Sequence, residues 1–459
     1  MRYYLLNLYL GRVCIAIAAD ALCFAAAAAL SWWILAPPFD PGSYASAAAL
    51  GTLASFVALY YAGAYGLQVL GSGRRTLRCL LASMGLVSAG GLLLPVLLDL
   101  APPVLAAMAH TAGLYFPLLA AERLLFRTLS ALPRFSQRLI VIGTSDLGVA
   151  IAEAVRARPN LGSQLVGFLS DEFRDEGGRV AGYPVLGKVH EIEKLVERFA
   201  IGRIVVASKS RNEYFPAEEL LALKLRGARV ESGVSFYERV TGRIYLRDLR
   251  SSYLIFSEGF HSRRPLSAAA KRALDASVAG IGLVLAAPIL ALGALLVKLD
   301  SRGPAFFRQE RVGQDGRPFS VWKLRSMVDR AEDESGPRFS ASDDDRITRV
   351  GRILRKARLD EVPQLWNVFR GDMSLVGPRP ERPEFLDELS ARYPYFRLRS
   401  ALKPGVTGWA QVRYGYVNDP AGFEHKLALD LYYMKYRSLV MDLLILWKTA
   451  KTVVLLHGT

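Results

Sequence analysis

Residues 355–380 read RKARLDEVPQLWNVFRGDMSLVGPRP, and the rest of the chain is organised around this stretch. It contains an adjacent acid pair, Asp360 and Glu361, set among basic residues, and ends in a turn that carries Arg379 between two prolines. Positive neighbours favour ionised carboxylates, which serve as nucleophiles or metal ligands. Because each proline fixes φ near about −65°, the turn presents the Arg379 guanidinium at a set angle, where it suits a phosphate. Together these groups indicate phosphoryl-transfer chemistry.

A purely structural role for the acid pair is the alternative. Asp360 is also a suitable N-cap residue, with Glu361 in the first turn of a helix and Pro363 just inside it. Neighbouring helical side chains point about 100° apart, so the two carboxylates need not converge on one ligand. The surrounding motifs decide between these interpretations.

Composition places the chain among membrane proteins. It has 459 residues, of which 52% are hydrophobic and 22% charged, and a net charge of +16. An apolar yet basic chain is typical of a membrane protein with cytoplasmic surfaces that face phosphate, and we expect no nucleic-acid partner. The three cysteines show no CxxC spacing and predict neither disulfides nor a zinc site.

Four apolar segments, at about 13–36, 45–70, 79–100 and 103–125, are each long enough to cross a membrane. Basic residues alternate between the connecting loops so that both ends of this part should lie in the cytoplasm. We therefore expect a four-helix transmembrane bundle at 1–130, in a membrane that borders the cytoplasm. Asp20 lies inside the first segment, where a hydrogen bond within the bundle is the expected role.

Strand and helix patterns alternate from Gln137 onward and predict a Rossmann-like α/β domain with its linker at 131–262. RLIVIG, QLVGFLSDE and RIVVAS are expected strands, and VAIAEAVRARP is an expected helix. Ser145 stands where the dinucleotide fingerprint has its second glycine, which favours docking or regulation over cofactor binding.

Residues 273–298 form a second long apolar run, with basic residues at both ends and Pro288 in its middle. A crossing helix would place the following residues outside the cytoplasm, away from nucleotides. A helix that Pro288 kinks, so that it enters one leaflet and returns, satisfies both the charges and the proline. We expect this re-entrant helix hairpin to carry a mainly helical catalytic domain at 263–459. An ordinary fifth span is the alternative.

Ordered motifs now identify a family. KLRSM, the stretch at 355–380, KPGVTGWAQVRYGY (403–416) and DLYYMKYRSLVMDLLIL occur in this order. The chain resembles the bacterial sugar transferase family of polyprenyl-phosphate phosphoglycosyl transferases, and in particular the long members that start exopolysaccharide assembly. That resemblance implies transfer of sugar-1-phosphate from a UDP-sugar to undecaprenyl phosphate, through a phosphosugar-aspartate intermediate and with release of UMP.

Carried onto this sequence, the resemblance makes Asp360 the nucleophile and Glu361 a ligand of Mg²⁺. Lys323, Arg355 and Arg379 lie at positions that family members use around the phosphates. Arg413 is a further phosphate-binding candidate, although a tight turn that packs Trp409 against the core explains its motif equally well.

Two other function classes compete. A membrane-tethered nucleotide-sugar dehydratase or epimerase is disfavoured because the glycine fingerprint is broken and the sequence has no Tyr-x-x-x-Lys. A non-catalytic membrane scaffold of polysaccharide assembly is disfavoured by the intact acid pair and GPRP turn. Inner membrane lipid is an expected partner, and a homodimer is a further expectation.

Overall fold

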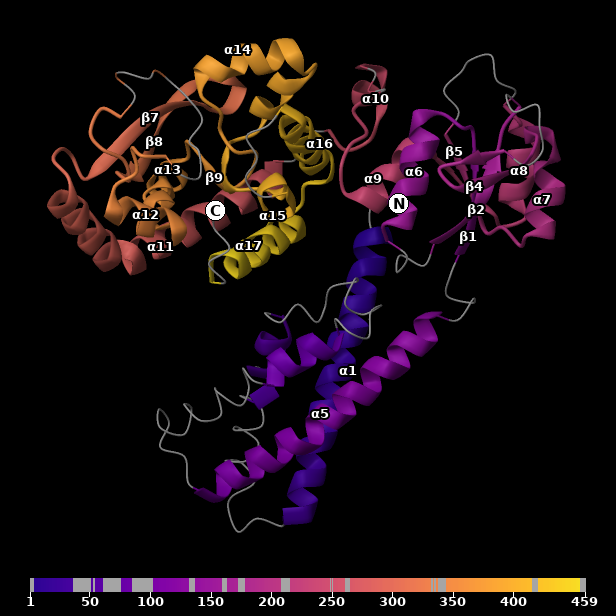
Figure 1. Ribbon diagram of the computed structural model, residues 1–459, viewed down its shortest axis with the longest axis horizontal. Helices are drawn as coiled ribbons and strands as arrows, with labels where there is room; N and C mark the ends of the chain where they lie inside the picture. Colours follow the sequence, from indigo (N-terminus) through magenta and orange to yellow (C-terminus); the bar gives the residue numbers. More distant parts are fainter. Residues whose placement is uncertain are drawn as a thin grey trace. The chain divides into compact units, whose positions relative to one another are not determined.

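The computed structural model describes residues 4–35, 51–52, 54–60, 76–84, 102–131, 137–158, 163–171, 178–207, 215–247, 249, 251–260, 265–331, 333, 336, 344–414 and 420–454. Packing divides the chain into two compact units, Met1–Thr241 and Gly242–Thr459 (Figure 1).

Two long helices, α1 (Tyr4–Leu35) and α5 (Pro102–Ala131), pack against each other at the start of the first unit. They contain the first and fourth predicted apolar segments. Residues 54–60 and 76–84 are also helical, but most of the second and third predicted segments lies outside the described residues. By length and composition, Ile15–Leu35 can cross a membrane.

A buried ion pair joins α1 to α5. Nη2 of Arg123 donates to both carboxylate oxygens of Asp20, at 2.9 and 2.7 Å, and neither side chain is more than 3% exposed. The expected hydrogen bond of Asp20 to a neighbouring helix is confirmed, and its partner is an arginine. Because a lone charge costs several kcal/mol in a low-dielectric interior, this pair favours one register between the two helices.

The second part of this unit is the predicted α/β domain. Its sheet has the order β3-β4-β2-β1-β5-β6, and all neighbours are parallel except β3 and β4. The elements are β1 (Gln137–Ile142), α6 (Asp146–Arg156), β2 (Ser163–Leu169), β3 (Arg179–Val180), β4 (Tyr183–Gly187), η3 (Val189–Glu191), α7 (Ile192–Arg198), β5 (Arg203–Val206), α8 (Ala217–Leu225), β6 (Arg229–Ser232) and α9 (Gly233–Thr241).

Apolar alternation along β1 explains the layers of this domain. Ile140 and Ile142 join the cluster formed with α7 and α8, whereas α6 and α9 contact each other. The predicted strands and helix are confirmed. The Ser145 hydroxyl donates to the carbonyl of Ala207 at 2.6 Å and accepts from the Gly148 N–H at 3.5 Å. It therefore ties the start of α6 to the residue that follows β5, near the place where a Rossmann fold normally receives a ligand.

The second unit is mainly helical, as expected. Its elements are α10 (Ser251–Phe256), α11 (Pro265–Asp300), β7 (Phe306–Val312), η4 (Gln314–Gly316), β8 (Pro318–Leu324), α12 (Arg349–Lys356), η5 (Leu359–Glu361), α13 (Gln364–Arg370), β9 (Ser374–Val376), α14 (Pro383–Arg392), η6 (Phe396–Ala401), β10 (Gly405–Thr407), α15 (Trp409–Tyr414), α16 (Pro420–Tyr436) and α17 (Leu439–Val454). Strands β7 and β8 pair as an antiparallel hairpin, and β9 and β10 pair in parallel.

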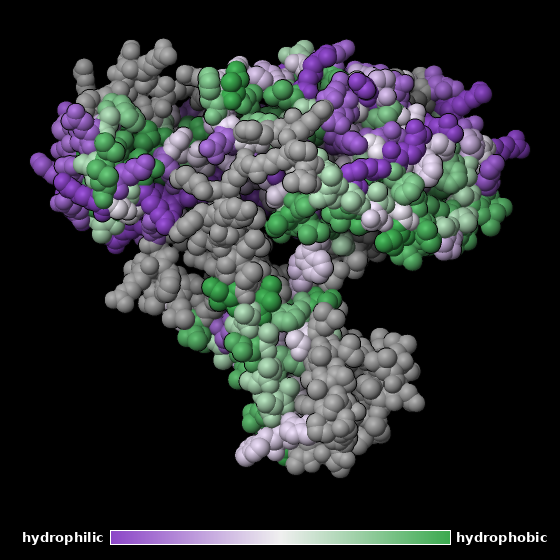
Figure 2. Space-filling view, turned by 180° about the vertical axis from the view of Figure 1, so that it is seen from behind, coloured by the Kyte–Doolittle hydropathy of each residue, from purple (hydrophilic) through white to green (hydrophobic). Residues whose placement is uncertain are grey.

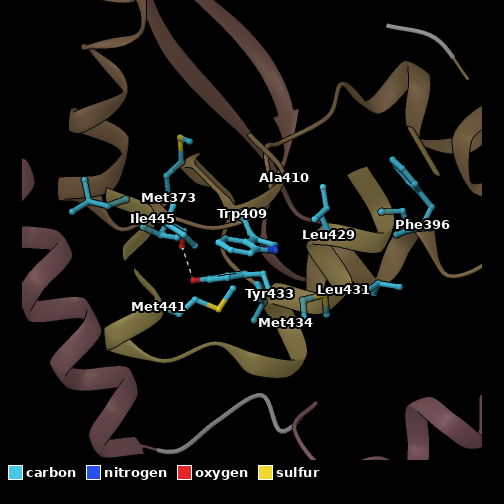
Figure 3. Close-up of a cluster of buried hydrophobic side chains, with 14 of the residues drawn as sticks. Met373, Phe396, Trp409, Ala410, Leu429, Leu431, Tyr433, Met434, Met441 and Ile445 are labelled. Carbon is cyan, nitrogen blue, oxygen red and sulfur yellow. Dashed lines mark hydrogen bonds between the residues drawn. The ribbon is translucent and has the colours of Figure 1, made fainter. Parts of the chain in front are cut away.

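The core of this unit gathers side chains from β9, α15, α16 and α17 (Figure 3). Trp409 stacks on Tyr432 with ring centroids 6.1 Å apart, and its indole N–H donates to the carbonyl of Gly242 at 2.8 Å. Residues just after Gly242 belong to the same core, since Ile244 is 1% exposed and its N–H donates to the carbonyl of Ala428. This packing holds β9, which leads into the GPRP turn.

Both ends of α11 pack on the second unit. Near its start, Nζ of Lys271 lies 2.7 Å from Oδ2 of Asp442, and Asp275 accepts a 2.8 Å hydrogen bond from the Ser374 hydroxyl. Near its end, Val297 is buried against Leu324 and Leu354. The helix therefore lies along the rest of the second unit over much of its length.

The outward face of α11 is apolar. Ala268–Asp300 is the second helix, among the described residues, that is long and apolar enough to cross a membrane. Pro288 lies inside this helix, which continues on both sides of it. Figure 2 shows hydrophobic side chains gathered along the lower edge of the second unit, below a hydrophilic surface. The exposed apolar residues of α11 are Val278, Ile281, Val284, Leu285, Ile289, Leu292, Leu295, Leu296 and Leu299.

Candidate active site

A reversal of the chain after α12 positions the acid pair. The Thr348 hydroxyl caps α12 by accepting from the Gly351 N–H at 3.0 Å. The helix then ends at Lys356, and Arg358 adopts the left-handed conformation with φ of 59°. This turn starts the short η5 helix, which carries both acids, and α13 follows at once. The acid pair thus sits on a tight connection between two helices.

Neither acid caps a helix. The N-cap positions of η5 and α13 are Arg358 and Pro363, and neither makes a side-chain capping bond. Asp360 is instead buried, with 8% of its surface exposed. The structural alternative raised for the pair, an N-cap at Asp360, is therefore not the role that the structure shows.

Glu361 is held by two cations from distant parts of the chain. Nη2 of Arg379 donates to its Oε1 at 2.5 Å and Nη1 to its Oε2 at 3.4 Å, a two-pronged contact. Nζ of Lys323, on β8, lies 3.7 Å from the same Oε1. Burial alone raises the pKa of this carboxyl, but the charges of Arg379 and Lys323 outweigh it and hold the pKa well below its ordinary value. Glu361 is therefore an anion at any ordinary pH.

Asp360 has a different environment. Its Oδ1 is buried and has no hydrogen-bond partner among the described residues. Burial, followed by the charge of Glu361, raises the pKa of Asp360 to about 6. The positive charges of Lys323, Arg355 and Arg379 act in the opposite direction. A poorly solvated carboxylate that is mostly ionised at neutral pH is a strong candidate nucleophile, because few hydrogen bonds must be broken before it attacks.

The GPRP turn is built by two backbones that approach each other closely. The Gly377 N–H donates to the carbonyl of Thr407, and the Gly405 N–H donates to the carbonyl of Pro378, both at 2.9 Å. A Cβ atom on Gly405 would lie 2.1 Å from the Gly377 nitrogen, so only glycine fits there. The turn therefore delivers Arg379 to Glu361 from a rigid base.

Four of the predicted site residues come together around Asp360: Glu361, Lys323, Arg355 and Arg379. Arg413 has other contacts. Its guanidinium lies 4.9 Å from the centre of the Trp409 ring, and Nζ of Lys448 lies 5.1 Å from the same ring. Its predicted role at a phosphate stays a prediction.

Magnesium is suited to the donor atoms present. Among the described residues, no group of three or more His, Cys, Asp or Glu side chains can hold a metal ion. Mg²⁺ is, however, commonly bound by one or two carboxylates together with the phosphate oxygens of a substrate. The ionised Glu361 and the unpartnered Oδ1 of Asp360 are hard oxygen donors of this kind.

Sequence reasoning missed a group of residues that contact the backbone of Arg379. Arg399, on η6, is buried and donates to the backbone carbonyl of Arg379 at 3.1 Å. Its other partners are Asp430 on α16 and Glu381. These residues are far apart in sequence and occur in no recognisable motif, so no local pattern indicates them.

Comparisons with known proteins identify the families that two parts of this chain resemble. Residues 266–456 match the family model for bacterial sugar transferases, and residues 61–214 match the model for a CoA-binding domain. A UDP-N-acetylgalactosamine-undecaprenyl-phosphate N-acetylgalactosaminephosphotransferase of Aeromonas hydrophila is 41% identical over 216 residues, which cover 47% of this chain and 50% of that protein. This chain thus spans half the length of that relative.

Two further relatives each match more than a third of this chain. A UDP-glucose:undecaprenyl-phosphate glucose-1-phosphate transferase of Caulobacter vibrioides is 48% identical over 183 residues, covering 39% of this chain and 67% of that protein. The exopolysaccharide production protein PSS of Rhizobium leguminosarum bv. phaseoli is 42% identical over 187 residues, covering 39% of this chain and 92% of that protein. Together with the two long apolar helices, these relatives indicate a membrane protein. The chain belongs to the bacterial sugar transferase family.

Proposed function

We propose that this protein transfers sugar-1-phosphate from a UDP-sugar to undecaprenyl phosphate and releases UMP, as the first membrane step of exopolysaccharide biosynthesis. The observation that carries the proposal is the acid pair: a buried Asp360 with an unpartnered oxygen lies beside Glu361, which Arg379 and Lys323 hold. Two of the relatives named above, those of Aeromonas hydrophila and Caulobacter vibrioides, are named for transfer from UDP-N-acetylgalactosamine or UDP-glucose to undecaprenyl phosphate.

In the first step, a carboxylate oxygen of Asp360 attacks the phosphorus that bears the sugar. The bond from this phosphorus to the bridging oxygen breaks, and UMP leaves with that oxygen and its electron pair. In the second step, a phosphate oxygen of undecaprenyl phosphate attacks the same phosphorus. The bond to Asp360 breaks, which regenerates the carboxylate and yields undecaprenyl-diphosphate sugar. Two anionic substrates therefore never have to react with each other directly.

The cations around Glu361 supply the positive charge that binds the substrate diphosphate. Without substrate, Arg379 and Lys323 neutralise Glu361. A diphosphate that enters the site offers them more negative charge and, for Arg379, two oxygens in the geometry of its present bidentate contact. As these cations turn to the phosphates, the Glu361 carboxylate becomes available to a metal ion. Arg355 adds positive charge near Asp360, which opposes the rise in its pKa and favours the ionised form.

Glu361 would hold Mg²⁺ together with the diphosphate oxygens of the substrate. When bound, the ion neutralises charge that develops on the leaving phosphate. The fit rests on the ionised state of Glu361 and on the hard oxygen donors of the acid pair.

Helix α11 brings the site to the lipid. A transmembrane helix has its ends on opposite sides of a hydrocarbon core about 30 Å thick. Both ends of α11 contact the same folded unit, through Lys271 and through Val297, while its middle exposes apolar side chains. This favours a helix that enters the cytoplasmic leaflet and returns, with Pro288 in its middle, over a fifth span. Undecaprenyl phosphate can then reach Asp360 without leaving the membrane surface.

The test is UMP release by the purified full chain, with Mg²⁺ and a panel of UDP-sugars, with and without undecaprenyl phosphate. The wild type should turn over one of the UDP-sugars, and it should do so only when undecaprenyl phosphate is present. Asp360→Asn should turn over none of them. Asp387→Asn is the matched control, because this aspartate is on the same unit but 83% of its side chain is exposed.

The covalent step has its own readout. Without lipid, the wild type should release about one equivalent of UMP and gain the mass of the sugar phosphate on the peptide that contains Asp360. Absence of UMP release from every sugar, in a preparation with lipid present, would overturn the proposed function and favour a scaffold. UMP release without a protein-bound sugar phosphate would overturn the aspartate intermediate alone.

A further inference from the structure

In the GPRP turn and the residue after it, each backbone carbonyl from Pro378 to Glu381 accepts its own hydrogen bond. Four consecutive residues, 378–381, each have a carbonyl that accepts a hydrogen bond from a different donor. The donors are the Gly405 N–H at 2.9 Å, Arg399 Nη2 at 3.1 Å, Arg311 Nη1 at 3.2 Å and the Val312 N–H at 2.9 Å. Two of these residues are prolines without an N–H, so the turn has little capacity to stabilise itself and depends on these outside donors.

The group that donates to the Arg379 carbonyl is the buried guanidinium of Arg399. Arg399 is 6% exposed, and its three nitrogens are divided among three partners. Nε donates to Oδ2 of Asp430 at 2.7 Å, Nη1 to Oε1 of Glu381 at 3.2 Å, and Nη2 to the Arg379 carbonyl. Asp430 is 2% exposed. The two acids therefore fix the plane of the guanidinium from both sides, and this plane sets where the third nitrogen points.

Stability alone is a poor explanation for this arrangement. Burying an arginine with two carboxylates costs desolvation energy that the pairing only roughly offsets, and apolar side chains of similar size often stabilise a protein more. An arginine is instead well suited to pinning a backbone carbonyl at one place and angle, because its fork of donors is planar and rigid. The pinned residue here is the one that grips Glu361.

We propose that Arg399, oriented by Asp430 and Glu381, is a positioning residue for the phosphate clamp: it holds the backbone of Arg379 where its guanidinium meets the diphosphate. This inference rests on the proposed function, since it gives Arg379 a substrate phosphate to bind. Arg399 itself touches neither Glu361 nor Lys323 in the contacts described here and acts through Arg379.

The test is a double-mutant cycle on full-length protein with UDP and Mg²⁺ as the binding probe. Arg399→Met should weaken UDP binding and raise KM for the UDP-sugar by about 10- to 100-fold, because a misplacement of about 1 Å can cost as much as about 100-fold. In an Arg379→Ala background the same substitution should have almost no further effect, because the residue that it positions is gone. Arg397→Met is the matched control: it lies on the same helix η6, and 66% of its side chain is exposed.

The possible outcomes distinguish failure of the proposed function from failure of the positioning role of Arg399. If wild type neither binds UDP nor releases UMP, the proposed function fails. If wild type is active and Arg379→Ala is impaired, but Arg399→Met behaves like the Arg397 control, the positioning role is overturned. Equal losses in both backgrounds also overturn it, because they indicate general damage to the fold. Should Arg399→Met fail to fold, the cycle is run with Asp430→Asn, which keeps an acceptor oxygen for Nε and removes only the charge.

Discussion

The rate of sugar-phosphate transfer should follow the ionisation of Asp360. Burial and the adjacent Glu361 charge raise the pKa of this carboxyl to about 6 in the free protein. Only the ionised form attacks phosphorus, so kcat/KM of the first half-reaction should rise with pH and level off above neutrality. With one group of this pKa, about one molecule in eleven is ionised at pH 5 and about ten in eleven at pH 7, a rate difference of about tenfold.

A single substitution should move this profile in a known direction. Arg355 lowers the pKa of Asp360, so Arg355→Gln should raise it and shift the rising limb to higher pH. A shift of about half a unit to one unit, or ~0.7–1.4 kcal/mol, is expected for the loss of one nearby charge. Arg352→Gln is the control, because this exposed residue on the same helix is not among the charges that act on Asp360.

The assay is single-turnover release of UMP without lipid acceptor, from pH 5 to 8, at fixed Mg²⁺ and ionic strength. The folded state of each variant is checked at each pH by circular dichroism. A flat profile between pH 5 and pH 7 would refute the assignment of Asp360 as the group that must ionise. A shift to lower pH in Arg355→Gln would show that the electrostatic reasoning about Arg355 is wrong.

Three further outcomes are expected. The pKa of Asp360 is raised above its unfolded value of 3.8, so the stability that it contributes is full below that pH and is lost as the pH rises through about 6. Asp360→Asn should therefore stabilise the inactive protein at pH 8 by roughly 2–3 kcal/mol. A lower melting temperature than that of the wild type would contradict this. Removal of divalent cations with EDTA should abolish UMP release, and added Mg²⁺ should restore it; full activity in EDTA would exclude the proposed metal. Asp20→Leu should cost about 1–3 kcal/mol, because it removes the two hydrogen bonds from Arg123 and leaves Glu122, whose Oε2 lies 3.3 Å from Nη1, as the carboxylate beside this buried guanidinium. Combining it with Arg123→Met should recover part of the loss in thermal unfolding in detergent.

Local patterns in the sequence determined the elements of the fold. Apolar alternation and helical periodicity depend on residues a few positions apart, which is why β1, β2, β5 and α6 were predicted close to their observed bounds. Length and composition alone marked the long apolar helix at 273–298, which lies within α11. The order of the motifs was enough to identify the family.

The same local information located the acid pair and the GPRP turn, since prolines and charged neighbours are visible in the sequence. It did not show which cation meets which carboxylate. Glu361 is contacted by Arg379, 18 positions later, and by Lys323 from another element. Nor did it show that Asp360 is buried while Arg413 lies against Trp409.

What the sequence indicated by itself was therefore most of the described elements, the family and the candidate site residues, because these follow from short-range propensity, spacing and motif order. Only the tertiary structure decided the electrostatics of the site. The raised pKa of Asp360, the lowered pKa of Glu361 and the support of Arg379 by Arg399 and Asp430 all arise from packing between distant segments. Coulomb and desolvation energies depend on distance in space and on burial, and neither quantity is encoded in any local stretch of the chain.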